Sequence, residues 1–104
     1  MFKISIITVV RNDLSGLKKT EVSILNQTYS KYEWVVIDGN SNDGTKEYVN
    51  NLNHDFIYSL SEKDKGIYDA MNKGIRRATG ELVGFLNSGD VFGSSNVLEH
   101  VSQT

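Results

Sequence analysis

The sequence contains no cysteine and no proline among its 104 residues. The lack of cysteine excludes disulfide bonds, thiolate metal sites and cysteine nucleophiles. Without proline, glycine and asparagine are left to mark the turns. No apolar run approaches the ~20 residues that a membrane-spanning helix requires. The first ten residues have some features of a secretory signal, but no small-residue cleavage site follows them, so we interpret them as a strand and expect a cytoplasmic protein.

The sequence also has no excess of positive charge. Eleven Lys and Arg stand against thirteen Asp and Glu, which gives a net charge of −2. Proteins that bind duplex nucleic acid normally carry a basic face, so the balance argues against such a partner. The apolar content of 38% and the charged content of 23% are typical of globular proteins and exclude a disordered or coiled-coil chain. We therefore expect residues 1–104 to form a single domain.

The hydrophobic pattern alternates between the spacing of strands and that of helices. Buried strands are predicted at 3–10, 33–38, 56–60 and 81–86. Between them, helical spacing predicts a helix capped by Ser15, a short helix capped by Asp43 or Thr45 and running through Leu52, a third helix beginning near Ile67, and a last helix from Ser94 onward. This order predicts an α/β fold: three layers, with a mainly parallel sheet covered by helices on both faces.

The third predicted helix carries a row of small residues beside its apolar row. Ala70, Gly74 and Ala78 recur every four residues, and we expect this row to let the helix lie close against the sheet. Gly80 is predicted to end the helix in the left-handed conformation. Trp34 lies inside a predicted strand and is expected in the core.

Polar, acidic segments follow all four predicted strands, whereas the opposite connections are plainer. The four segments are 11–13, 38–44, 62–66 and 87–90, and each of the last three contains glycine. In an open parallel sheet, ligands bind outside the carboxyl ends of the strands. The sequence therefore predicts a polar ligand at this edge.

Individual residues in these segments allow two interpretations. Asp38 is either a solvated turn acid or an acceptor for a nucleobase N–H or a ribose hydroxyl, and Asp43 is either a helix cap or a ligand. Residues 87–90 form either a β-turn or a divalent cation site built on Asn87 and Asp90. Lys63 and Lys65 are either solvated or face a diphosphate together with helix amides.

Four segments in order resemble the amino-terminal half of inverting family 2 glycosyltransferases of the GT-A fold. These segments are SIITVVRN (5–12), QTY before WVVIDGNSNDGT (27–29 and 34–45), DKGIYDAMNKGI (64–75), and ATGE leading to FLNSGD (78–81 and 85–90). Each is weak alone. Together, at compatible spacings, they cover nearly all of residues 3–93 and form a specific pattern.

The resemblance implies roles for particular residues. Thr8 and Arg11 match positions that frame the nucleotide, and Asp38 matches the acid that contacts the nucleobase, usually uracil. Lys65 and Gly66 match the segment near the ribose and phosphates of the donor. The resemblance also implies a cation site. Residues 87–90 match the Asp-x-Asp region, in which Asn87 and Asp90 would hold Mg²⁺ or Mn²⁺ on the donor diphosphate.

The sequence departs from the family pattern in two ways. Asn87 and Gly89 occupy positions where aspartates often fall, which leaves Asp90 as the only carboxylate and predicts weaker metal binding without nucleotide. In addition, the GT-A fold usually continues for about another hundred residues, which supply the acceptor site and the catalytic base. We therefore expect a truncated, donor-binding part of the fold, with the base absent.

The resemblance implies a transferase that moves a sugar from a nucleotide-diphosphate donor, most often a UDP-sugar, to a glycan or lipid-linked acceptor in polysaccharide biosynthesis. A homodimer through the exposed sheet edge, and peripheral association of the full-length protein with the inner face of the membrane, are further expectations. Two alternatives remain at this point. One is a nucleotide-binding or interaction module without catalysis, and the other is a receiver domain, although Ser61-Glu62 supplies no phospho-accepting aspartate after the third strand.

Overall fold

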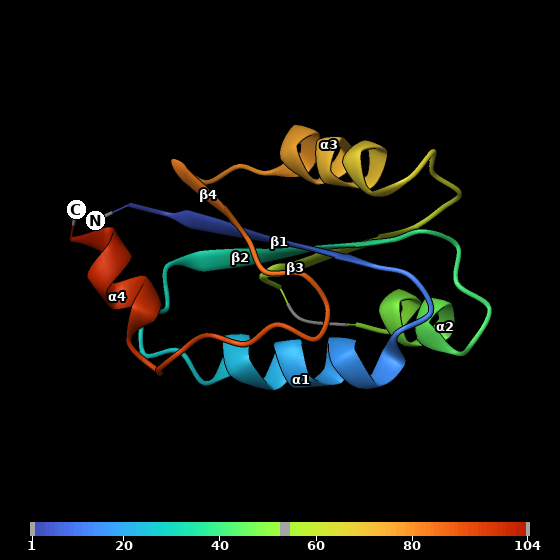
Figure 1. Cartoon of the computed structure of the whole chain (residues 1–104). Helices are drawn as coiled ribbons and strands as arrows, with labels where there is room; N and C mark the ends of the chain where they lie inside the picture. Colours follow the sequence, from blue (N-terminus) through green and yellow to red (C-terminus); the bar gives the residue numbers. More distant parts are fainter. Residues whose placement is uncertain (1, 53–54, 104) are drawn as a thin grey trace.

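The computed structural model describes residues 2–52 and 55–103, and these ranges form alternating strands and helices (Figure 1). The elements in chain order are β1 (Ile4–Val10), α1 (Leu14–Leu25), β2 (Tyr32–Asp38), α2 (Thr45–Asn50), β3 (Ile57–Ser61), α3 (Ile67–Arg77), β4 (Leu82–Phe85) and α4 (Val97–Ser102). The predicted order of strands and helices is confirmed. The largest shifts from the predicted bounds are in the short helices: α2 ends before Leu52, and α4 begins after Ser94.

The four strands form one sheet in the order β3-β2-β1-β4, and every pair is parallel. This order is that of the first half of a dinucleotide-binding sheet, whereas receiver domains have the order 2-1-3-4-5. The receiver alternative is therefore wrong. β2 and then β3 are added on one side of β1, whereas β4 is added on its other side, so the order of the strands switches between β1 and β4. In open α/β sheets this switch point is where ligands bind, beyond the carboxyl ends of the strands.

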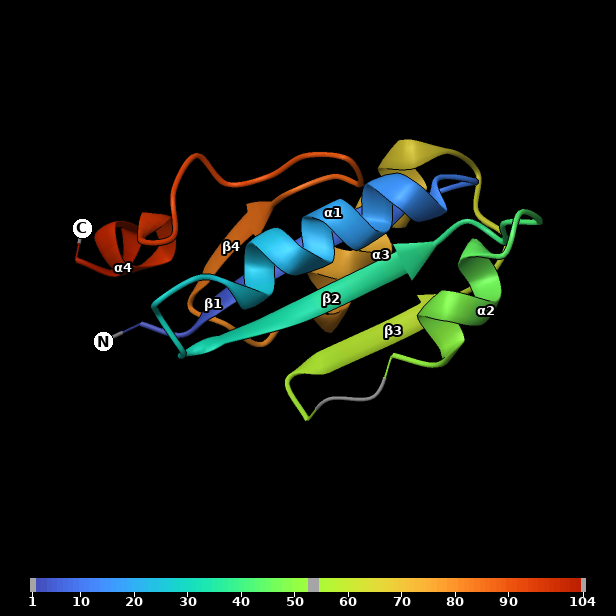
Figure 2. The same cartoon turned by 90° about the horizontal axis from the view of Figure 1, so that it is seen from below.

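Helices cover both faces of the sheet, as predicted. Figure 1 shows α3 on one face and α1 and α2 on the other, with α4 on the same side as α1; in Figure 2, α1 lies over the sheet and runs along the direction of its strands. Alternate residues of β1 point to the two faces, so Ile6 belongs to the core under α1 and Ile7 to the core under α3. Trp34 is fully buried in the first of these cores, as expected.

β4 forms one edge of the sheet and is only partly covered. Val83 and Phe85 are 46% and 41% exposed, although an apolar run of this kind is typical of a strand buried on both faces. An edge strand of this type can pair with a further chain segment. The homodimer expected from this edge stays a prediction.

The small-residue row of α3 brings the helix close to β1. Ala70 and Gly74 are its buried residues, and a Cβ atom added to Gly74 would lie 2.4 Å from Cγ2 of Ile7. Ile7 is itself fully buried and β-branched, so its methyl group cannot swing away. The glycine therefore sets the distance between helix and sheet.

Replacing Gly74 by alanine is expected to destabilise the domain by about 1–3 kcal/mol, the usual cost of overpacking a core. Helix propensity alone would give the opposite sign, because alanine is favoured over glycine by about 1 kcal/mol in a helix. Urea unfolding measures the difference, with Asn72→Ala on the exposed face of the same helix as the control. Equal or greater stability of Gly74→Ala would contradict the close packing.

The predicted start of α1 and the predicted end of α3 are wrong. The N-cap of α1 is Asp13, not Ser15: the Asp13 carboxylate accepts the Gly16 N–H at 3.2 Å. α3 ends at Arg77, and Gly80 is not among the residues with positive φ. Gly80 is needed for another reason, since a Cβ there would lie 2.7 Å from the backbone nitrogen of Ser5. The glycine allows the chain to pass close to β1 before β4 begins.

Candidate functional site

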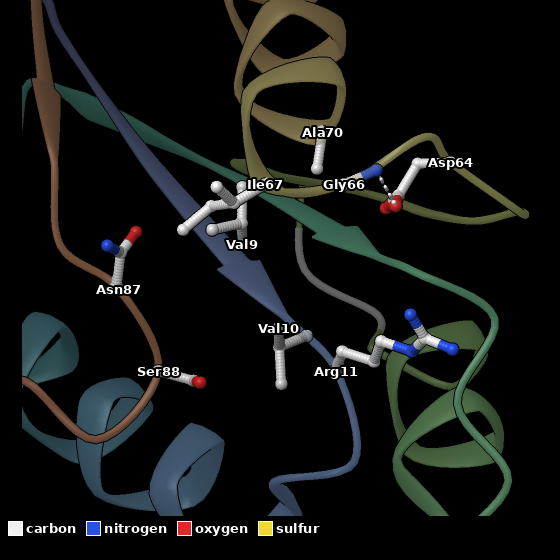
Figure 3. A pocket seen from close by; sticks show the side chains of 9 residues that line it. All are labelled: Val9, Val10, Arg11, Asp64, Gly66, Ile67, Ala70, Asn87 and Ser88. Carbon is white, nitrogen blue, oxygen red and sulfur yellow. Dashed lines mark hydrogen bonds between the residues drawn. The ribbon is translucent and has the colours of Figure 1, made fainter.

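A pocket of about 290 Å³ lies at the carboxyl edge of the sheet, on the α3 side of the switch point between β1 and β4 (Figure 3). Three segments far apart in the sequence form it: the end of β1, the connection from β3 into α3, and the turn after β4. The predicted convergence of the polar segments at this edge is thus seen for three of the four. The lining residues are Val9, Val10, Arg11, Asp64, Gly66, Ile67, Ala70, Asn87 and Ser88.

The pocket combines an apolar floor with polar groups around it. Val9 and Ala70 are buried in the core beneath α3, and Ile67 is half exposed above them. Arg11 is exposed, and no ion pair links it to another described residue. A cation without an acidic partner at the end of a central strand is suited to an anionic ligand.

The amino terminus of α3 opens onto the pocket at Gly66. This residue has φ = +120°, a conformation that side chains disfavour, and a Cβ there would meet nothing within 4 Å. The Gly66 N–H donates to the Asp64 carboxylate at 3.0 Å (Figure 3), which fixes the connection just before the helix. The first turn of an α-helix carries unpaired N–H groups and a partial positive charge, both of which favour a phosphate.

Lys73 of α3 contacts the connection between β3 and α3 and fixes it to the helix. Its ammonium group lies 2.9 Å from the Glu62 carboxylate and donates to the Lys63 carbonyl oxygen at 3.0 Å. The hydrogen bond that the ammonium group donates to Glu62, together with the charges of Glu62 and Asp69, raises the pKa of Lys73. Lys73 therefore stays charged near neutral pH and holds the polar wall of the pocket.

Asn87 presents an unsatisfied oxygen in this site. Its Oδ1 atom is buried and has no hydrogen-bond partner among the described residues, and Asn87 lines the pocket. Three residues later, Asp90 is exposed. No group of three or more His, Asp or Glu side chains in residues 2–52 and 55–103 could hold a metal ion. Two hard oxygen donors fit Mg²⁺ or Mn²⁺, which bind few protein ligands and complete their shell with phosphate and water.

Asp38 is engaged inside the protein rather than directed into the pocket. It is fully buried, and its carboxylate accepts hydrogen bonds from the Ser41 N–H at 3.0 Å, from the Ser41 hydroxyl at 2.5 Å and from the Ser61 hydroxyl at 2.7 Å. The Ser41 hydroxyl oxygen in turn accepts the Asn12 N–H at 2.8 Å. In this structure Asp38 therefore joins the segments that follow β1 and β2 to the end of β3.

Thr8 is also an interior residue. Its hydroxyl donates to the Leu86 carbonyl oxygen at 2.6 Å and accepts the indole N–H of Trp34 at 2.8 Å. It is fully buried and does not line the pocket. Thr8 thus fixes the end of β1 against the segment after β4, from which Asn87 projects.

Asp43 acts at the start of α2. Its carboxylate accepts both the N–H and the hydroxyl of Thr45, at 3.0 and 2.5 Å. The hydroxyl and backbone hydrogen bonds from Thr45 lower the pKa of Asp43. The N-cap position itself is Gly44, with φ = +100°. The predicted cap at Asp43 or Thr45 is therefore wrong by one residue: Asp43 lies just before the N-cap, and its carboxylate is engaged by Thr45.

Of the residues predicted for the site, Arg11, Gly66 and Asn87 line the pocket. Lys65 and Asp90 are exposed neighbours of lining residues, whereas Thr8 and Asp38 are fully buried and do not line it. Sequence reasoning assigned no role to Asp64, although it directly precedes Lys65 in a predicted polar segment. Asp13 was also missed: it accepts a hydrogen bond from the Ser88 hydroxyl at 3.1 Å, and only the fold brings these residues together.

Residues 5–102 match the model of glycosyl transferase family 2. An uncharacterized glycosyltransferase of Mycobacterium tuberculosis is 44% identical over 96 residues, which cover 91% of this chain and 37% of that protein. The glycosyltransferase AglE of Haloferax volcanii is 36% identical over 89 residues, covering 81% of this chain and 29% of that protein. The chain thus spans about a third of the length of the relatives it matches.

Solved structures of longer proteins share the fold. A mannosyltransferase of Pyrobaculum calidifontis, in complex with GDP-Man and Mn²⁺, superimposes with a TM-score of 0.88 at 25% identity, covering 98% of this chain and 32% of that one. S. aureus TarS in complex with UDP-GlcNAc gives 0.81 at 25% identity, covering 97% and 30%. The pocket at the switch point, the parallel sheet and these matches define the class: the chain belongs to glycosyl transferase family 2.

Among the described residues, none of the helices has the length and apolar character needed to cross a bilayer.

Proposed function

We propose that this chain binds the nucleoside diphosphate of a sugar nucleotide and forms the donor-binding part of a glycosyltransferase. The observation that carries the proposal is the convergence of three groups on one pocket. They are the Arg11 guanidinium without an ion pair, the amino terminus of α3 at Gly66, and the unpartnered Oδ1 atom of Asn87. An anion and a cation held side by side, as in a metal diphosphate, would satisfy all three.

The diphosphate is assigned to the space between Arg11 and the start of α3. Guanidinium groups form charge-assisted hydrogen bonds with phosphate oxygens, and helix N–H groups add to them. Lys65 is exposed directly before Gly66, so its ammonium group can reach a phosphate that lies over the helix start.

The cation is assigned to Asn87 Oδ1 and the Asp90 carboxylate, with phosphate oxygens as the remaining ligands. When bound, Mg²⁺ or Mn²⁺ would neutralise the charge of the departing nucleoside diphosphate by Lewis-acid action. The Mn²⁺ in the complex of the Pyrobaculum mannosyltransferase supports this assignment.

The nucleobase contact of Asp38 and the framing role of Thr8 stay predictions. Both side chains are buried and do not line the pocket; their hydrogen bonds would act on the site by fixing the segments that carry Arg11 and Asn87. UDP is the proposed nucleotide; the relatives in complex with UDP-GlcNAc and with GDP-Man make GDP the comparison to test.

In the whole protein, a hydroxyl of a glycan or lipid-linked acceptor would attack the anomeric carbon of the donor sugar and displace the nucleoside diphosphate with inversion. No described residue is identified as the base for this step. The acceptor, a cytoplasmic location, association with the membrane and a role in polysaccharide biosynthesis are parts of the same proposal.

Isothermal titration of the chain with UDP, GDP and ADP, with Mn²⁺ or with EDTA, tests the proposal. We expect UDP with Mn²⁺ to bind with a Kd below about 1 mM, corresponding to about −4 kcal/mol, and EDTA to weaken the binding. An absence of heat at millimolar UDP and GDP would contradict it.

A further inference from the structure

The hydroxyl of Thr20 lies against the turn that carries Asn87 and Asp90. Thr20 is in the middle of α1 and is fully buried. Its hydroxyl donates to the Asp90 carbonyl oxygen at 2.7 Å, with the Asn87 carbonyl oxygen at 3.3 Å, and accepts the Gly89 N–H at 3.0 Å. One side chain of α1 therefore contacts both ends and the middle of the turn.

Backbone hydrogen bonds also hold this turn. The Ser88 N–H donates to the Val9 carbonyl oxygen at 3.3 Å. The Gly89 N–H also donates to the Gly16 carbonyl oxygen at 3.0 Å, and the Asp90 N–H donates to the Asn87 carbonyl oxygen at 2.9 Å. Gly89 has φ = +91°, so the turn adopts a conformation that depends on glycine. With the backbone groups engaged in this way, the side-chain oxygens of Asn87 and Asp90 remain for a ligand.

Threonine is suited to this position by its stiffness. A β-branched side chain in a helix has few accessible rotamers, so its hydroxyl is held in place. Groups that orient metal ligands without touching the metal commonly change its affinity by about 10–100-fold.

We propose that Thr20 is a positioning residue for the cation site: its hydroxyl sets the geometry in which Asn87 Oδ1 and the Asp90 carboxylate meet one ion. This inference rests on the proposed function, because it assigns Thr20 to the same site. Nothing in the sequence pattern marks Thr20, which contacts the turn only through the fold.

The test compares Thr20→Val, which keeps the shape and removes the hydroxyl, with Thr20→Ser, which keeps the hydroxyl. Mn²⁺ binding in the presence of UDP is followed by the electron paramagnetic resonance of free Mn²⁺. We expect Thr20→Val to weaken Mn²⁺ binding by about ten-fold or more and Thr20→Ser to stay within about three-fold of the wild type. UDP binding in EDTA should be the same in all three proteins.

Ser23→Ala is the matched control. The Ser23 hydroxyl accepts the Phe92 N–H at 2.8 Å, which is the same kind of contact from α1 but beyond the turn. Its loss should leave Mn²⁺ affinity unchanged. Amide hydrogen exchange at 88–90, measured without ligand, should accelerate in Thr20→Val alone.

Three outcomes would overturn the inference. These are wild-type Mn²⁺ affinity in Thr20→Val, an equal loss in Ser23→Ala, and a loss in Thr20→Ser as large as in Thr20→Val. A wild-type chain that binds UDP but does not lower the signal of free Mn²⁺ would instead contradict the cation site of the proposed function. The inference would then fail with it.

Discussion

Replacing Asp90 by alanine is expected to weaken Mn²⁺-supported UDP binding by about 10- to 100-fold. Asp90 is the only carboxylate in the turn 87–90, so its removal leaves the ion with a neutral amide oxygen from the protein. Since each tenfold change in affinity is about 1.4 kcal/mol, this range corresponds to about 1.4–2.8 kcal/mol. Isothermal titration with and without Mn²⁺ measures the change.

The metal dependence separates this effect from a general loss of folding. In EDTA, the wild type and Asp90→Ala should bind UDP equally, because the remaining contacts come from Arg11 and the start of α3. Asp90→Asn keeps an oxygen donor without the charge and should fall between the two. Glu47→Ala removes an exposed acid of α2 and should have no effect. Unchanged Mn²⁺-supported affinity in Asp90→Ala would exclude the proposed cation site.

Replacing Asp38 by alanine is expected to destabilise the fold by about 3 kcal/mol. The change removes the acceptor of three hydrogen bonds and leaves the Ser41 N–H and the two serine hydroxyls without their partner. A buried donor without an acceptor costs about 1–3 kcal/mol, and hydrogen bonds to a charged group lie at the upper end. Urea unfolding near neutral pH measures the loss.

Asp43→Ala provides the comparison within the same loop. Asp43 is exposed and accepts hydrogen bonds from the Thr45 N–H and hydroxyl, so the loss of stability should be smaller. At urea concentrations below its unfolding midpoint, Asp38→Ala should also bind UDP more weakly than the wild type. The reason is that Ser41 would no longer fix Asn12, the residue next to Arg11. A stable Asp38→Ala protein that has lost only uridine selectivity would instead support the predicted nucleobase contact.

Much of the fold could be predicted because it depends on local patterns. The Ile- and Val-rich runs at 3–10 and 33–38 are typical of strands buried on both faces, and the structure has β1 (Ile4–Val10) and β2 (Tyr32–Asp38) at these places. The small-residue row of α3 predicted its close approach to the sheet, and Gly74 meets Ile7 there. The rule that ligands bind at the carboxyl edge then predicted where the pocket would be.

Helix ends and side-chain directions were harder to predict, since several residues compete for the same local role. Asp13 and Ser15 are both good N-caps, and the choice depends on the path of the chain out of β1. Gly80 has the residue type of a helix stop, but its conformation is decided by the backbone of Ser5, 75 residues earlier. Such contacts leave no mark at short range in the sequence.

The sequence by itself determined the alternation of strands and helices, the parallel sheet and the polar edge, because hydrophobic spacing and turn residues act over a few positions. The tertiary structure alone decided which polar groups face the ligand. It directed Asn87 Oδ1 into the pocket and surrounded Asp38 with serine hydroxyls, and it placed Thr20 against the turn that it holds. The physical reason is that burial and hydrogen-bond satisfaction depend on neighbours supplied by distant segments, which only the folded chain brings together.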